Sequence, residues 1–120
     1  MLTAALCAAA TLAVAQEAPP ARTADERRDL LELAYSLGQT HYLRTLCRGE
    51  DDQTWRTRMT RMVEVEAPDE VFRQRLVDTF NDGWLILQPR HRECGTAARE
   101  EAARTAQAGA MLADRMASRR

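Results

Sequence analysis

The spacing of apolar residues is the feature that most constrains the fold of this chain. From about residue 23 onward, apolar side chains recur every three or four positions, and no run alternates with the period of a β-strand. Leu30, Ala34, Leu37 and His41 share one such stripe. The pattern predicts an all-α protein, and a length of 120 residues predicts a single domain.

Caps and breakers set the bounds of the first two predicted helices. Thr23 and Glu26 have the spacing of a capping box, and this helix runs to about Arg48. A second helix follows the acidic run at 50–52, where an aspartate can cap it. It ends near Glu66 because Pro68 disfavours a helical conformation in the residue before it.

The second half of the chain predicts two more helices. One begins with Pro68 in its first turn and continues to about Leu87, where Pro89 predicts either a kink or an end. The other is capped by Thr96 and reaches about Ser118. Short connections make consecutive helices run in opposite directions, so residues 23–118 are predicted to form a small four-helix up-down bundle.

The first 15 residues are uncharged, mostly small or aliphatic, and end in Ala-Val-Ala. This composition predicts a cleavable secretory signal peptide at 1–15, followed by a flexible, proline-containing leader at 16–22. Export implies a periplasmic or secreted protein with no stable membrane insertion after cleavage. The net charge of −1 indicates no nucleic-acid partner.

Two cysteines, Cys47 and Cys94, lie beyond the predicted signal peptide. In an exported protein such a pair predicts a disulfide, and the up-down arrangement brings the C-terminal ends of the first and third helices to the same end of the bundle. Two alternatives are a redox-active pair and a zinc site that adds His91 to both thiolates. We favour the structural disulfide and predict no metal and no cofactor.

A polar cluster is the other candidate site: His41, Tyr42, Arg44 and Glu66. His41 can be a buried side chain whose nitrogens bond to neighbours, or a general base or pH sensor. Glu66 falls on the apolar side of its helix, where it can pair with Arg44. The cluster is therefore either structural or functional.

Several segments together resemble a family of small exported bacterial proteins of unknown function. They are LGQTHYLRTLC at 37–47, Trp55 and Arg56, RLVDTFNDGW at 75–84, Cys94, and the alanines 97–98. The likeness covers about residues 27–118, and its most specific parts are LGxxHYLRxLC and FNxG. Pro89 departs from the family pattern. The resemblance implies export and a helical fold with two cysteines, and it implies no activity.

The leading functional hypothesis is a non-enzymatic periplasmic accessory protein that presents a helical face or groove to another envelope protein. One alternative is a small envelope enzyme with His41, Tyr42 and Arg44 in one pocket as acid, hydrogen-bond donor and anion holder. Another is a chaperone that responds to acid. The enzyme hypothesis differs from the others in requiring that His41, Tyr42 and Arg44 converge on one cavity.

Overall fold

A computed structural model describes the protein at residues 12–13 and 21–119. Apart from residues 12–13, the predicted signal peptide lies outside the described residues, as does the leader up to residue 20. The described part contains four α-helices and no strand, as the periodicity predicts. The helices are α1 (Ala24–Arg48), α2 (Thr54–Glu66), α3 (Glu70–Ile86) and α4 (Thr96–Ser118).

The predicted capping box at the start of α1 is present. The Thr23 hydroxyl accepts a hydrogen bond from the Glu26 backbone N–H, and the Glu26 carboxylate accepts one from the Thr23 N–H. At the start of α2, Gln53 occupies the capping position without a side-chain cap, so the predicted aspartate cap is absent there. The Asp52 carboxylate instead accepts a bond of 3.2 Å from the Thr54 N–H, a donor that a first turn leaves without an intrahelical partner.

Prolines determine how α2 and α3 end. Ala67, which precedes Pro68, adopts a left-handed conformation with φ of 43°. Asp69 then caps α3 by accepting from the Phe72 N–H, so Pro68 lies before the helix and not in its first turn as predicted. α3 stops at Ile86, three residues before Pro89, so the proline ends the helix and does not kink it.

The start of α4 differs from the prediction. Thr96 is the first helical residue, Gly95 occupies the capping position, and no side chain caps this end. The sequence argument was wrong here because a glycine immediately before a helix can take the extended conformation that the cap requires.

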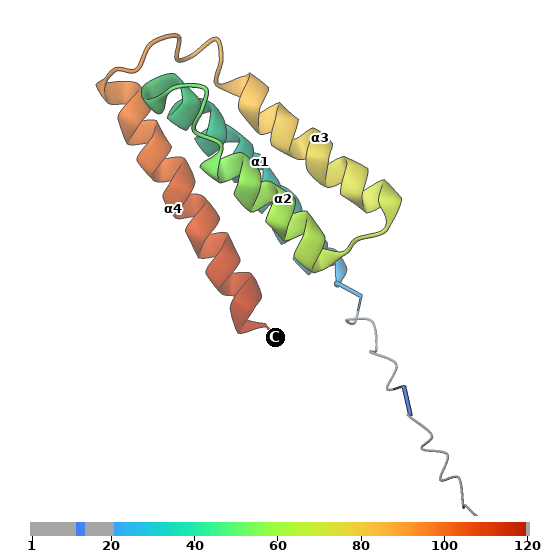
Figure 1. Ribbon diagram of the computed structural model, residues 1–120. Helices are drawn as coiled ribbons and strands as arrows, with labels where there is room; N and C mark the ends of the chain where they lie inside the picture. The colour runs from blue at the N-terminus through green and yellow to red at the C-terminus, as the bar shows by residue number, and fades with distance from the viewer. Residues whose placement is uncertain (1–11, 14–20, 120) are drawn as a thin grey trace, which may run out of the picture.

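The longest helix, α1, is the common core of the molecule (Figure 1). It packs against α2, α3 and α4, and in Figure 1 α2 lies between the other two. α1 and α3 run in the same direction, since Arg27 lies over the Phe72 ring towards one end and His41 contacts Trp84 towards the other. The main core gathers apolar side chains of all four helices, among them Leu30, Leu37, Met59, Leu76, Phe80 and Leu112.

Two glycines allow α1 and α3 to touch backbone to backbone. A Cβ atom built on Gly38 would lie 1.9 Å from the carbonyl oxygen of Phe80, and one built on Gly83 would lie 2.2 Å from that of Tyr35. No side chain fits at either position. Each glycine belongs to one of the two motifs on which the family resemblance rests, LGxxHYLRxLC and FNxG.

The predicted disulfide between Cys47 and Cys94 is confirmed, with Cα atoms 4.9 Å apart. It ties the end of α1 to the loop between α3 and α4, beside a second apolar cluster of Leu43, Leu87 and Ala98. The zinc alternative is wrong, because both sulfurs are bonded to each other. Between residues 21 and 119, no group of three or more metal-ligating side chains gathers.

Candidate functional site

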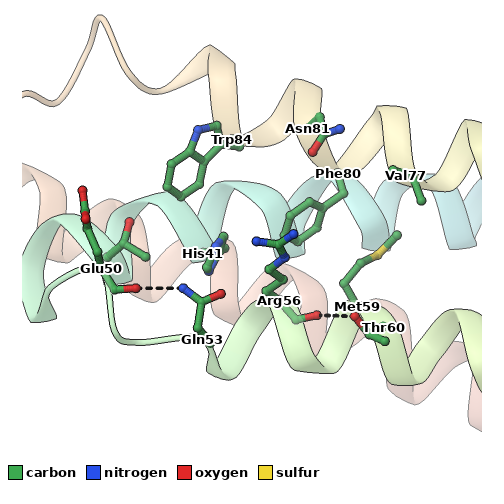
Figure 2. A pocket seen from close by; sticks show the side chains of 11 residues that line it. His41, Glu50, Gln53, Arg56, Met59, Thr60, Val77, Phe80, Asn81 and Trp84 are labelled. Carbon is green, nitrogen blue, oxygen red and sulfur yellow. Dashed lines mark hydrogen bonds between the residues drawn. The ribbon is translucent and has the colours of Figure 1, made fainter.

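An open cleft lies between α2 and α3, with α1 as its floor (Figure 2). Its volume is about 520 Å³, within the size range of small-ligand pockets. α1 contributes the imidazole of His41 at the centre of the floor. The side chains that matter most for its chemistry are His41, Gln53, Arg56, Phe80, Asn81 and Trp84.

His41 is positioned by two aromatic rings of α3. Its imidazole centroid lies 5.0 Å from that of Trp84 and 5.7 Å from that of Phe80. The residue exposes only 6% of its surface, and Nδ1 has no hydrogen-bond partner among the described residues. A buried polar atom without a partner costs roughly 1–3 kcal/mol, so the burial of His41 Nδ1 is energetically unfavourable in this fold.

The electrostatic setting keeps this imidazole neutral. Burial lowers the pKa of His41, the positive charge of Arg56 lowers it further, and Asp52 acts in the opposite direction. A neutral imidazole offers one donor and one acceptor. His41 can therefore both give and receive a hydrogen bond at neutral pH.

This setting predicts how stability depends on pH. Below the unfolded pKa of 6.5, the unfolded chain binds a proton at His41 that the folded chain resists, so the free energy of unfolding falls as the pH drops from 6.5 through the folded pKa. We expect this slope, at most about 1.4 kcal/mol per pH unit, to be smaller in His41→Gln. Urea denaturation between about pH 5 and pH 7.5 measures it. His91→Gln is the control, and equal slopes in wild type and His41→Gln would contradict the prediction.

Arg56 supplies the cation of the cleft. Figure 2 shows its side chain extending from α2 between the helices, near His41 and Phe80. In the described part of the chain its guanidinium makes no ion pair or hydrogen bond. The Glu50 side chain also lines the cleft, where its backbone carbonyl accepts a bond of 2.8 Å from Gln53.

The structure does not bring the four residues of the predicted polar cluster together. Of these, only His41 lines the cleft. The Tyr42 hydroxyl donates to the backbone carbonyl of His91 and its ring packs edge-on against Trp84, so it stabilises the α3–α4 connection. Arg44 is half-buried, and its Nε has no hydrogen-bond partner in residues 21–119.

Glu66 lies at the other end of the fold from Arg44. Its carboxylate accepts two hydrogen bonds of 2.8 Å from Arg22, just before α1. α2 returns along α1, so its last residue reaches the beginning of that helix and not the end. The ion pair raises the pKa of Arg22 and anchors the segment that precedes α1.

Another, smaller groove lies on the opposite side of α2, facing α4, and has a volume of about 200 Å³. Trp55 and Met62 of α2 line it together with the small residues Ala106 and Gly109 of α4. Arg58 lies here with its guanidinium 4.4 Å from the centroid of the Trp55 ring. Arg56 and Arg58 of α2 thus line different grooves, which makes Arg58 a matched control for Arg56.

Sequence reasoning identified His41 but missed Gln53, Arg56, Asn81 and Trp84 as its neighbours. Three of these four lie in segments that carry the family resemblance: Arg56 follows Trp55, and Asn81 and Trp84 belong to RLVDTFNDGW. Their membership in these segments could therefore have identified them as candidates. That they meet in one cleft could not be predicted, because it depends on how α2 and α3 pack on α1.

The described residues form a small, disulfide-linked helical fold with an open cleft of mixed polarity. The chain belongs to the family described as "Protein of unknown function (DUF2385)", which matches residues 26–120. This match confirms the resemblance to a family of unknown function. Comparisons with curated proteins and with solved structures found no match. No helix within the described residues has both the length and the apolar character needed to cross a membrane.

Proposed function

We propose that this chain is an exported accessory protein that acts in the periplasm and binds another envelope protein through the His41 cleft. The observation that carries the proposal is the imidazole of His41, 6% exposed and with an unpartnered Nδ1, on the floor of an open cleft.

Export is the part of the proposal that the sequence supports most directly. The uncharged apolar segment at 1–15 has the composition of a signal peptide, and a disulfide is favoured outside the reducing cytoplasm. Cell fractionation should recover the protein from the periplasm, shortened at its N-terminus and without free thiols. Full-length protein in the cytoplasm with both thiols reduced would contradict this part.

Binding through the cleft is tested by site-specific photo-crosslinking in cells. A photoreactive residue replaces Val77, which lines the cleft, or Met111, which is 61% exposed on α4 away from it. We expect a discrete crosslinked product from position 77 and not from position 111. Products from position 111 alone, or from neither position, would count against the proposal.

A further inference from the structure

The cleft combines an unpaired cation with a buried hydrogen-bonding group. The exposed Arg56 side chain lines the cleft without a carboxylate partner among the described residues, as is also true of Arg58 and Arg61 elsewhere on α2. A guanidinium presents its N–H groups in a fork that matches the two oxygens of a carboxylate. Arg56 can therefore bind a carboxylate in the cleft through two parallel hydrogen bonds.

The walls of the cleft suit an apolar side chain next to that anion. Phe80 and Trp84 line the α3 side, and the His41 ring lies within 6 Å of both ring centroids. At these distances the rings contact one another, so they form one continuous aromatic surface against which a flat or branched apolar group can lie. A bare inorganic anion would leave this surface uncovered.

Polar groups beside the aromatic wall can bond a peptide unit. Gln53 and Asn81 line the cleft from its α2 and α3 sides, and each amide offers donors and an acceptor. A peptide backbone presents an N–H and a carbonyl at short intervals, which these groups can satisfy.

Charges of both signs surround the cleft. Glu50 lines it together with Arg56, and Asp52 acts on His41 electrostatically. Arg61 lines the neighbouring surface of α2 with Arg56, and Arg44 and Arg48 act on Asp52. A carboxylate carries one charge and needs only one guanidinium to pair with it.

We propose that the His41 cleft binds the free C-terminus of a partner protein, with the terminal carboxylate on Arg56 and an aromatic or branched apolar last side chain against Trp84. A chain end is the group that carries a carboxylate, an apolar side chain and a peptide bond on adjacent atoms. This inference rests on the proposed binding function and names the part of the partner that the cleft receives.

Affinity selection with synthetic peptides tests this assignment. The disulfide-intact mature protein is mixed with a pool of tetrapeptides of random sequence that end in a free carboxylate, and in parallel with the same pool ending in an amide. Bound peptides are identified by mass spectrometry. We expect enrichment from the carboxylate pool alone, with aromatic or branched apolar residues at the last position. Equal enrichment from the amidated pool, or none from either, would overturn the assignment.

Matched arginine variants then locate the carboxylate. For the most enriched peptide, Arg56→Gln should weaken binding at least about tenfold, because a charge-assisted pair is lost. Arg58→Gln, which removes the same charge from the other side of α2, should change the dissociation constant by less than about twofold. Arg56→Lys should be intermediate, because the charge remains and the fork is lost. An equal effect of the Arg56 and Arg58 substitutions would overturn the assignment.

A small carboxylic acid distinguishes a protein C-terminus from a free small acid, since both carry a carboxylate beside an apolar group. N-acetylphenylalanine has the terminal carboxylate and ring but lacks the preceding peptide units. We expect it to bind more weakly than the enriched peptide, and equal affinity would show that the cleft is a site for free small acids. If peptides fail while crosslinking at Val77 still succeeds, the chain-end assignment fails and the proposed function stands.

Discussion

Gly38→Ala should lower the free energy of unfolding by about 3 kcal/mol or more, a large share of the stability of a domain of this size. The new methyl group would lie 1.9 Å from the Phe80 carbonyl oxygen, so α1 and α3 must separate along their contact. The higher helix propensity of alanine, worth about 1 kcal/mol, opposes this effect and is smaller. Urea denaturation followed by circular dichroism measures the difference.

Gly83→Ala tests the same contact from the other helix. Its methyl group would lie 2.2 Å from the Tyr35 carbonyl oxygen, so we expect a loss of similar size. One separation of the two helices relieves both overlaps, and the double variant should therefore lose less than the sum of the single losses. Full additivity would indicate that each substitution acts locally.

Gly109→Ala is the matched control. A Cβ atom at this buried position of α4 would lie 3.6 Å from Leu33 Cδ1 and 3.7 Å from Ser36 Cβ, which are ordinary contact distances. We expect no loss and a gain of up to about 1 kcal/mol from helix propensity. The explanation fails if Gly109→Ala is as damaging as Gly38→Ala, or if the latter leaves stability unchanged.

Removing the disulfide should have the other large effect. The double substitution Cys47→Ala and Cys94→Ala opens a link between residues 47 positions apart. The chain-entropy relation then gives a loss of about 4 kcal/mol, because the unfolded chain regains the freedom that the crosslink removed. Chemical denaturation of the double variant, compared with wild type before and after reduction, measures this loss.

Hydrogen exchange can show which segment becomes less stable when the disulfide is removed. The loop between α3 and α4 is held by the disulfide, by the Tyr42 bond to the His91 carbonyl and by the contact of His91 with Glu101. We expect hydrogen exchange to accelerate most between residues 87 and 98 in the double variant, since two weaker contacts remain there. A loss below about 1 kcal/mol, with unchanged exchange in this loop, would contradict the assigned role of the bond.

Most element boundaries could be predicted because they depend on neighbours in sequence. The capping box of Thr23 and Glu26 works over one helical turn, and Pro68 and Pro89 act on the residues immediately before them. The error at Thr96 has the same local character, since Gly95 takes the capping position one residue earlier. Such features need no knowledge of the rest of the fold.

The pairing of Glu66 shows where local reasoning ends. Its position on the apolar side of α2 indicated a buried partner, and the sequence argument chose Arg44. The structure pairs it with Arg22, because the direction of α2 along α1 decides which arginine is near. The up-down order predicted from the short connections already implies this direction, so the choice of Arg44 was inconsistent with the predicted topology.

The amino-acid sequence by itself determined that this protein is helical, where most of its helices begin and end, and that Cys47 and Cys94 form its crosslink. These properties follow from hydrophobic period, caps, prolines and cysteine count, all of which act over short stretches or by composition. Only the tertiary structure decided that α1 is the shared core helix, that Gly38 and Gly83 bring two backbones together, and that Arg56 and Trp84 meet over His41. The reason is physical: these features are contacts between distant segments, and packing geometry selects them.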